Sequence, residues 1–486
     1  MFYQSTRGNN NLINSKEAVL RGIAEDGGLF MPANLDYSEF DWQSMLALST
    51  KEIAEKILQF FLDDFSDAKE IVASAYDNKF DTEELTPIVK VGDRFVLELF
   101  HGPTSAFKDV ALSVLPQLMV RAKSSHDKKT VILTATSGDT GKAALEGFHD
   151  VDGIEIIVFY PDGGVSAVQK MQMVTQAGAN VHSVAVRGNF DDCQTGVKNI
   201  FSEVEKSHLL AQTGAALSSA NSINIGRLVP QIVYYFKAYG ELVKQNEIKA
   251  GDAIDFTVPT GNFGDILAGY LAKKLGLPIG SLIVASNKNK ILTDFVNTGV
   301  YDKRREFYKT ISPSMDILVS SNLERLLYMM SDGDASFVKE MMQKLSSDAH
   351  YEIPEEMLKK IQAEFKAGFA SDEEAKSAIK EVWEKHHYLM DTHTATAWKV
   401  ASELKTDRPN VVLSTASPFK FPEAVSSALG INISKDEFET MENLSKATGV
   451  CAPKNLLGLN EKEIRFTDVI EKDEMLKYVI SIANKL

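Results

Sequence analysis

One lysine of this chain is well placed for covalent chemistry. Lys108 lies in the stretch HGPTSAFKDVAL, where a loop of Gly, Pro, Thr and Ser residues gives way to a helical pattern. A free lysine has a pKa of about 10.4 and is a poor nucleophile while protonated, but desolvation or a nearby positive dipole lowers that pKa. Such a lysine can form a Schiff base with a carbonyl cofactor, and Phe107 could shield it. The alternative is an ordinary lysine on a helix surface.

A glycine turn between a predicted strand and a predicted helix indicates an anion site. In PTGNFGDILAGYL, Gly261 and Gly264 bracket Asn262 and Phe263, and Asp265 follows at the start of the helix. Free backbone N–H groups and the helix dipole both favour an anion there. The functional interpretation is a phosphate cradle, and the alternative is an ordinary turn in which Asp265 stabilises the first helical turn. The spacing is not G-x-G-x-x-G, so a dinucleotide site is poorly supported.

A second turn of this kind offers hydroxyl groups as well as backbone donors. Ser137, Gly138, Asp139 and Thr140 follow the predicted strand TVILT and precede a helix. These groups suit a carboxylate or a phosphate, whereas the alternative is a helix N-cap. The turn is not a P-loop, because this chain lacks both the required earlier glycine and the hydroxyl residue after the lysine.

Two hydroxyl residues follow the predicted strand NVVLS. Ser414 and Thr415 could hydrogen-bond a ring nitrogen without imposing a charge, and the alternative is loop capping. A lysine for an imine, a phosphate cradle, a carboxylate loop and a hydroxyl for a pyridine nitrogen are together the groups that pyridoxal phosphate needs. The combination therefore indicates a pyridoxal-phosphate site, which no single motif indicates alone.

Predicted strands and helices, which must position these groups, alternate along the chain. From about residue 93, short β-branched runs are separated by helix-like stretches, which is typical of βαβ units and a parallel sheet. Ligands of such sheets bind at the carboxyl ends of the strands, where these motifs fall. The predicted strands are RFVLELF, KTVILTATSG, IEIIVFYP, ANVHSVAVRG, AIDFTVPTG, SLIVAS and NVVLSTAS.

Changes in sequence character divide the 486 residues, which are too many for one ordinary domain. Residues 1–92 are expected to form an N-terminal domain, and the alternating α/β part begins at about residue 93. Within that part, the charged and helix-patterned stretch at about 300–405 is predicted to be a helical insertion.

Composition narrows the class of protein. The net charge of −15 argues against partners such as nucleic acid or an anionic membrane. No apolar run approaches the ~20 residues that span a bilayer, and the N-terminus has no apolar signal core. Cys193 and Cys451 suggest neither a disulfide framework nor a zinc site, so no metal is expected. We expect a cytoplasmic, soluble protein with a small-molecule substrate.

The motifs resemble those of threonine synthase of the type found in bacteria and yeast. The resemblance is carried by HGPTSAFKD, TATSGDTG, PTGNFGD and STASPFKF, and it extends to NSINIGRLVPQIVYYF, DTHTATAW, YQSTRG and AEDGGLFMP. It implies the fold of the tryptophan-synthase-β group: two parallel-sheet α/β domains with pyridoxal 5′-phosphate between them, plus an N-terminal domain. On this resemblance, residues 119–229 are expected to form the smaller α/β domain, and residues 93–118 and 230–486 the large cofactor-binding α/β domain. The same resemblance implies a lyase of threonine biosynthesis that converts O-phosphohomoserine and water to L-threonine and phosphate, by γ-elimination and β-addition of water.

The resemblance also implies roles for single residues. Lys108 matches the Schiff-base lysine, and Thr415 the residue near the pyridine nitrogen. The whole cofactor-binding set is Phe107, Lys108, Gly261, Asn262, Phe263, Gly264, Asp265 and Thr415. The set that takes the substrate carboxylate is Ser137, Gly138, Asp139 and Thr140.

Three polar residues, Asp139, Arg227 and His393, each have a second interpretation. Related enzymes often carry asparagine where Asp139 stands, and an ionised carboxylate cannot donate a hydrogen bond to the cofactor's phenolate. Arg227 is our candidate partner for the substrate phosphate, and the alternative is a structural or surface arginine. His393 lies in a family motif, and we expect a buried histidine with satisfied hydrogen bonds.

Two other functions compete with this hypothesis. A phospho-lyase of the same fold would degrade phosphohomoserine to a keto acid and phosphate with the same lysine and loops. A non-catalytic binding protein of the same fold is the other, but the presence of Lys108 and both turns argues against it.

Overall fold

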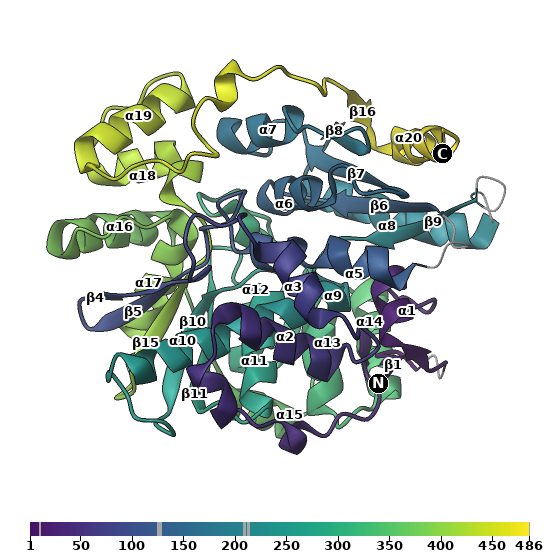
Figure 1. Ribbon diagram of the computed structural model, residues 1–486, viewed down its shortest axis with the longest axis horizontal. Coiled ribbons are helices and arrows are strands. Elements are labelled where there is room, and N and C mark those ends of the chain that lie inside the picture. Colours follow the sequence, from purple (N-terminus) through teal and green to yellow (C-terminus); the bar gives the residue numbers. More distant parts are fainter. Residues whose placement is uncertain (9–10, 124–128, 208–209, 211–213, 486) are drawn as a thin grey trace.

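Two α/β units and an N-terminal segment make up the computed structural model (Figure 1), which describes residues 1–485 except 9–10, 124–128, 208–209 and 211–213. One unit contains a six-stranded sheet of order β14-β11-β10-β15-β5-β4, and the other a five-stranded sheet of order β16-β8-β7-β6-β9. Neighbouring strands run parallel in both sheets, apart from the antiparallel pair β4 and β5. The predicted fold class, a parallel-sheet α/β protein, is confirmed.

The large sheet is buried on both faces. Its strands are β4 (Ile88–Val91), β5 (Arg94–Glu98), β10 (Ile254–Pro259), β11 (Ile279–Ser286), β14 (Phe365–Phe369) and β15 (Asn410–Ser414). Phe256 and Val258 of β10 lie in the same core cluster as the helices α10 (Ile232–Lys244) and α11 (Gly264–Lys274). On the other face, Ile283 and Val412 pack with α16 (Asp372–His386), α17 (Thr392–Glu403) and α18 (Pro422–Leu429). Burial on both faces explains the continuous apolar runs within β11 (IGSLIVAS) and β15 (NVVLS).

The small sheet is covered in the same way. Its strands are β6 (Lys129–Ala135), β7 (Ile154–Pro161), β8 (Val181–Arg187), β9 (Ala215–Ser219) and β16 (Val469–Glu471). Ile132 and Ile156 pack with α6 (Asp139–Phe148) and α7 (Ala167–Val174). The alternate residues Val131 and Ile157 pack with α8 (Phe190–Ser207) and α20 (Met475–Ala483).

The C-terminal segment corrects the predicted domain boundaries. It runs from α19 (Glu437–Thr448) across to β16 and α20 beside the small sheet (Figure 1). β16 pairs with β8, and α20 packs on α8 through Met475 and Val479. Residues 469–483 therefore lie with the smaller unit, although we assigned them to the larger one. A three-residue strand gives almost no local signal, and its pairing partner is distant in the sequence.

The stretch at about 300–405 is not a purely helical insertion. It contains α13 (Leu323–Met330), α14 (Ala335–Ser347), α15 (Glu355–Glu364), α16, and the antiparallel pair β12 (Val300–Asp302) and β13 (His350–Glu352). It also contains β14, which pairs with β11 at the edge of the large sheet. α17, at its end, packs directly on that sheet. The prediction missed β14 because FKAGF combines a lysine and a glycine with only a few apolar residues.

The N-terminal segment forms a sheet of its own and packs on the larger unit. β2 (Ile13–Asn14), β1 (Phe2–Ser5) and β3 (Phe30–Pro32) are antiparallel, and α1 (Ser15–Arg21), α2 (Thr50–Phe61) and α3 (Ala68–Tyr76) accompany them. Arg7 and Thr6 both bind Glu324 of α13, at 2.7 Å and 2.6 Å. Among the described helices, none is long and apolar enough to cross a bilayer.

Candidate active site

A cavity lies where the carboxyl ends of β5, β10 and β15 meet segments that lead into and out of the small unit. Many of the predicted site residues line it, and they come from distant parts of the chain. The lining residues are Phe107, Lys108, Thr140, Asn221, Ser222, Arg227, Gln231, Pro259, Thr260, Gly261, Asn262, Phe263, Gly264, Asp265, Ser314, Met315, His393 and Thr415. Of the predicted set, Ser137, Gly138 and Asp139 are not among them.

Lys108 is the first residue of the short helix α4 (Lys108–Leu112) and is 9% exposed. The loop before it folds back on Asp109, whose carboxylate accepts hydrogen bonds from the Thr104 backbone N–H (2.8 Å) and hydroxyl (2.5 Å). A Cβ atom at Gly102 would lie 2.4 Å from the Asp109 Cβ, so this close return needs glycine. The loop thus sets Lys108 at the edge of the cavity.

The environment of Lys108 makes its ammonium group easier to deprotonate than that of an exposed lysine. Its ammonium nitrogen lies 4.6 Å from the centre of the Phe107 ring. Burial lowers the pKa of Lys108 to about 8; the negative charge of Asp139 opposes this shift, and the positive charges of Arg227 and Lys420 support it. A neutral amine is the nucleophilic form, so the lysine is suited to bind a carbonyl group.

The glycine turn lies over the N-terminus of α11. Phe263 has a left-handed backbone (φ 63°) and precedes Gly264, the first residue of the helix. A Cβ atom at Gly261 would lie 2.6 Å from the carbonyl oxygen of Ser314, so glycine is needed for the close approach of that segment. The first N–H groups of the helix thus lie beside the cavity, and they favour an anion.

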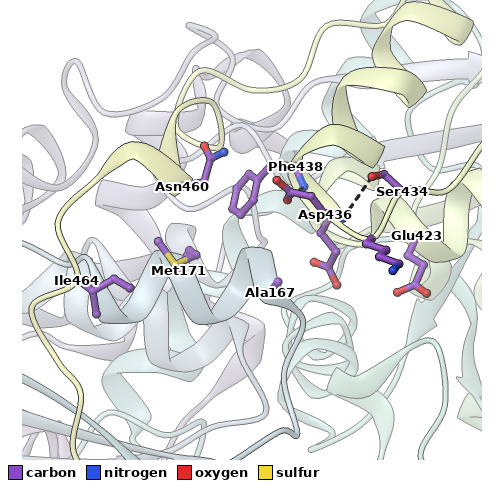
Figure 2. Close-up of a pocket in the computed structure, with 10 residues that line it drawn as sticks. Ala167, Met171, Glu423, Ser434, Asp436, Phe438, Asn460 and Ile464 are labelled. Atoms are coloured by element: carbon purple, nitrogen blue, oxygen red, sulfur yellow. Dashed lines mark hydrogen bonds between the residues drawn. The ribbon is translucent and has the colours of Figure 1, made fainter.

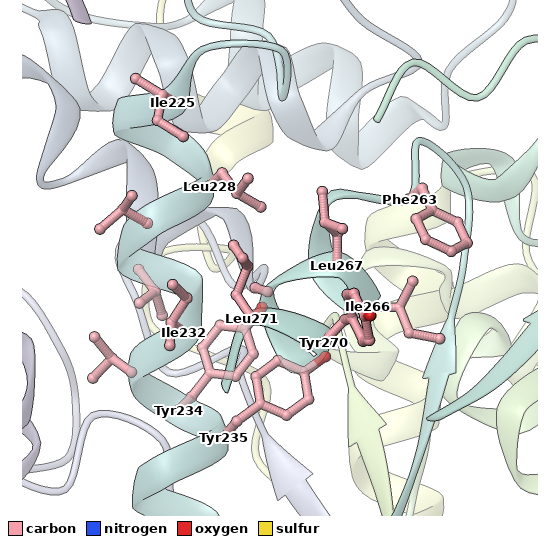
Figure 3. Packing of buried hydrophobic residues seen from close by; sticks show 14 of the residues in the cluster. Ile225, Leu228, Ile232, Tyr234, Tyr235, Phe263, Ile266, Leu267, Tyr270 and Leu271 are labelled. Atoms are coloured by element: carbon pink, nitrogen blue, oxygen red, sulfur yellow. The ribbon is translucent and has the colours of Figure 1, made fainter. Parts of the chain in front are cut away.

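The Asp265 side chain is held by two tyrosines of α10. Its Oδ1 accepts hydrogen bonds from the Tyr234 hydroxyl (2.5 Å) and the Tyr235 hydroxyl (3.0 Å). Figure 3 shows both tyrosine rings against α11, where they pack near Ile266 and Leu271. Burial raises the pKa of Asp265 to about 6, although the tyrosine hydrogen bonds act against this shift. The backbone of the turn, rather than this anchored carboxylate, is the part suited to an anion.

Arg227 is a buried cation with few partners. It lies in the short helix α9 (Ile225–Leu228), whose first turn is capped by the Asn224 side chain. Its Nη1 donates to the Ala220 carbonyl (2.8 Å), but its Nε has no hydrogen-bond partner among the described residues. Burial lowers its pKa to about 10. An unsatisfied buried guanidinium is costly, so this residue points to an anionic ligand in the cavity.

Two other basic residues near the predicted motifs, Arg121 and Lys142, are already paired with carboxylates. Arg121 binds the carboxylate of Asp67, and Lys142 binds that of Glu146 at 2.8 Å. Neither is among the residues that line the cavity.

Asp139 is paired with a lysine that the sequence analysis did not single out. It is the first residue of α6, and its Oδ1 lies 2.7 Å from Lys420 Nζ and accepts a hydrogen bond from Gln169 Nε2 (2.8 Å). Burial alone would raise the pKa of this carboxyl, but Lys420 and Lys108 hold it well below its ordinary range. Asp139 is thus ionised and can only accept hydrogen bonds.

The rest of the turn around Asp139 is shaped by two close contacts. The Thr136 hydroxyl accepts hydrogen bonds from the backbone N–H groups of Gly138 (2.9 Å) and Gly141 (2.8 Å). A Cβ atom at Gly138, where φ is 135°, would lie 2.4 Å from the Gln169 side chain. Of the predicted carboxylate set, Thr140 alone lines the cavity.

His393 is buried with satisfied hydrogen bonds, as expected. Its Nδ1 lies 2.8 Å from Asp391 Oδ1, and its Nε2 accepts a hydrogen bond from the Ser314 backbone N–H at 3.2 Å. A carboxylate can only accept here and a backbone N–H can only donate, so the proton is on Nδ1. The histidine also lines the cavity, next to Thr415 and the Ser314 segment.

A larger cavity, of about 680 Å³, lies elsewhere, between α7, α19 and the C-terminal segment (Figure 2). Its walls combine the apolar side chains of Met171, Phe438 and Ile464 with several acidic residues. One of these, Glu437, accepts a hydrogen bond from the Val168 backbone N–H at 3.1 Å. The acidic lining repels phosphate, and none of the four predicted motifs reaches this cavity.

Comparison with known proteins links the chain to one family. A family model described as "Pyridoxal-phosphate dependent enzyme" matches residues 81–415, "Threonine synthase N terminus" matches 2–76, and "Threonine synthase, C-terminal" matches 394–480. The chain is 40% identical to threonine synthase of Pseudomonas aeruginosa, over 88% of this chain and 90% of that protein. It is also 40% identical to "Threonine synthase-like 1" of Homo sapiens, over 85% of this chain but 58% of that longer protein.

Solved structures agree. The chain superimposes on pyridoxal-phosphate-bound threonine synthase from Brucella melitensis with a TM-score of 0.86 and 39% identity, and the match covers 99% of each chain.

Lys420→Met should destabilise the protein in a pH-dependent way. The variant keeps Asp139 buried but removes a cation that holds its pKa down, so burial then raises that pKa. A carboxyl whose pKa is raised by folding costs stability as the pH rises above its unfolded pKa of about 3.9. We expect a loss of about 3–5 kcal/mol in the free energy of unfolding at pH 7 and a smaller loss near pH 4. Urea denaturation of the cofactor-free protein measures it.

The double variant Lys420→Met/Asp139→Asn is the control, because a neutral amide needs no counter-charge. It should recover much of the lost stability at pH 7. An equal loss at both pH values, without recovery in the double variant, would show that the ion pair is not the cause.

Proposed function

Because the chain belongs to the threonine synthase family of pyridoxal-phosphate-dependent enzymes, we propose that it converts O-phosphohomoserine and water to L-threonine and phosphate, the last step of threonine biosynthesis. The observation that carries the proposal is Arg227, a buried guanidinium with an unsatisfied nitrogen in the same cavity as Lys108 and the glycine turn. A phosphate ester bound there would supply the missing anion. The cytoplasmic location expected from the sequence stays a prediction.

Pyridoxal 5′-phosphate is the cofactor of this family, and the cavity has the groups to hold it. We propose that Lys108 binds its carbonyl carbon and that the backbone N–H groups at Gly261, Asn262, Phe263, Gly264 and Asp265 bind its phosphate. Phe107 and Thr415 complete the proposed set, with the Thr415 hydroxyl at the pyridine nitrogen. A neutral hydroxyl, unlike a carboxylate, would impose no charge on that nitrogen. When bound, the cofactor supplies an electron sink for carbanions next to the substrate amino group.

We propose that residues of this chain remove the α-proton of the substrate and bind its two anionic ends. Lys108 Nζ would be the base for the α-proton, and its lowered pKa of about 8 suits that role near neutral pH. Thr140 and the turn of Ser137, Gly138 and Asp139 are proposed to bind the substrate carboxylate through N–H and hydroxyl groups. The pairing of Asp139 with Lys420 keeps its negative charge from opposing that carboxylate.

A second candidate function would use the same residues. A phospho-lyase that turns phosphohomoserine into a keto acid, ammonia and phosphate would use the same lysine and turns, and some relatives of this chain are named "Threonine synthase-like 1" rather than threonine synthase. Incubation of the purified protein with O-phosphohomoserine, followed by identification of the products, tests both. Threonine and phosphate in equal amounts support the proposal; a keto acid with ammonia and phosphate supports the alternative; no release of phosphate refutes both.

Lys108→Ala should abolish the cofactor bond that borohydride reduces. The parent protein should be yellow as purified, and after reduction the cofactor should stay attached to one peptide in mass mapping. Lys142→Ala is the matched control, since this lysine is also in a helix that follows a predicted motif but pairs with Glu146 outside the cavity. An adduct mapped to any lysine other than Lys108 would contradict the assignment.

Arg227→Ala should raise the Michaelis constant for O-phosphohomoserine while leaving the absorption of the bound cofactor intact. The lost charge-assisted hydrogen bonds are worth about 1.5–3 kcal/mol, or roughly a tenfold to hundredfold loss of affinity. Arg121→Ala, which removes an arginine paired with Asp67, is the control and should behave like the parent. If the Arg227 variant also behaves like the parent, Arg227 is structural and the phosphate is bound elsewhere.

A further inference from the structure

Ser314 lines the cavity, and its side-chain hydroxyl is unpartnered among the described residues. It lies in the short 3-10 turn Pro313–Met315, far in the sequence from the glycine turn that it lies beside. Its Oγ is shielded from solvent and has no hydrogen-bond partner among the described residues. A hydroxyl in such a place costs free energy unless a ligand satisfies it.

The segment that carries Ser314 is tied to the glycine turn. The Ser314 carbonyl oxygen lies over Gly261, where an added Cβ atom would come within 2.6 Å of it. Further along, the Ser320 hydroxyl donates to the Gly261 carbonyl (2.8 Å), and the Asn322 backbone N–H donates to the Asn262 carbonyl (3.0 Å). The segment thus covers the same turn whose N–H groups favour an anion.

The position of Ser314 is also fixed from two other sides. His393 Nε2 accepts the Ser314 backbone N–H, and Asp391 fixes the histidine tautomer that makes this possible. Two residues further, Asp316 accepts hydrogen bonds from Asn287 (2.7 Å), Asn289 (2.9 Å) and the Thr310 hydroxyl (2.7 Å). The hydroxyl is therefore held in place without being satisfied, which is the arrangement of a preorganised ligand-binding group.

We propose that the Ser314 hydroxyl donates a hydrogen bond to a phosphate monoester in this cavity, which the glycine turn and Arg227 also line. If the phosphate belongs to the substrate, this proposal rests on the proposed function. If it belongs to the cofactor, the proposal rests only on the pyridoxal 5′-phosphate that enzymes of this family use. Both phosphates share the chemistry of a dianion that accepts a hydroxyl hydrogen bond. Asp391 and His393 act on the ligand through Ser314 and are positioning residues.

Ser314→Ala tests the proposal with two pairs of ligands, each pair differing by one phosphate group. Cofactor-free protein is titrated with pyridoxal 5′-phosphate and with pyridoxal, and holoenzyme is titrated with O-phosphohomoserine and with homoserine, all followed by absorbance. We expect a roughly tenfold or greater loss of affinity for the phosphate-bearing member of one pair, and a change of less than about twofold for its phosphate-free partner. The affected pair identifies which phosphate Ser314 binds.

Stability separates a binding role from a structural one. Because the Ser314 hydroxyl makes no hydrogen bond within the described protein, the melting temperature of cofactor-free Ser314→Ala should equal or exceed that of the parent. Ser426→Ala is the matched control: this serine also has a buried, unpartnered hydroxyl, but it lies in α18 and does not line the cavity. The control should leave all four affinities unchanged.

Three results would overturn the proposal: no affinity change in either pair, an equal loss for pyridoxal and its phosphate, or a lowered melting temperature with a general loss of binding. The cofactor pair remains decisive if the proposed reaction is wrong. In that case the parent holoenzyme releases no threonine from O-phosphohomoserine, whereas the effect of Ser314→Ala on the cofactor phosphate is still read directly.

Discussion

The buried ammonium group of Lys420 is the constraint on which the arrangement of the cavity depends. It is fully buried, pairs with Asp139 at 2.7 Å and donates to the Thr104 carbonyl at 3.0 Å. A buried charge is tolerated only with such partners, so three loops cannot separate without a large cost in free energy. These loops follow β5 and β15 of the large sheet and β6 of the small sheet. One lysine therefore holds the carboxyl ends of both sheets together around Lys108, and its charge also helps to lower the pKa of Lys108.

Two buried arginines, Arg325 and Arg227, show how a structural cation differs from one that awaits a ligand. Arg325 donates from Nε and Nη2 to the Phe30 carbonyl, from Nη2 to the Ile223 carbonyl, and from Nη1 to Asn322. Arg227 is as deeply buried but donates to one carbonyl oxygen and leaves Nε without a described partner. Ser314 Oγ and Asp265 Oδ2 are further unsatisfied atoms on the same cavity wall. Such atoms are rare in folded proteins, and their convergence at one place is the physical signature of a polar ligand site.

The parts of this structure that could be predicted from the sequence are those with a local cause. β7 and β15 contain continuous apolar runs because both of their faces are buried, and the glycine turn before α11 is marked by Gly261 and Gly264. Lys108 was found because its loop has an unusual composition. β14 and β16 were missed because they are short edge strands whose formation depends on pairing with distant strands. The roles of Lys420 and Ser314 were not predicted for the same reason: the residues that surround them in the structure are distant from them in the sequence.

Local charge in the cavity, rather than the charge of the whole chain, decides which ligand can bind. The net charge of −15 repels anions at long range, but salt screens such fields beyond ~8–10 Å. Within the cavity, the charge of Asp139 is offset by Lys420, and Asp265 is held by two tyrosine hydroxyls with a pKa raised to about 6 by burial. Lys108 and Arg227 then remain as positive charges without a carboxylate partner among the described residues. The balance is positive where a phosphate and a carboxylate must both be accommodated, although the protein as a whole is acidic.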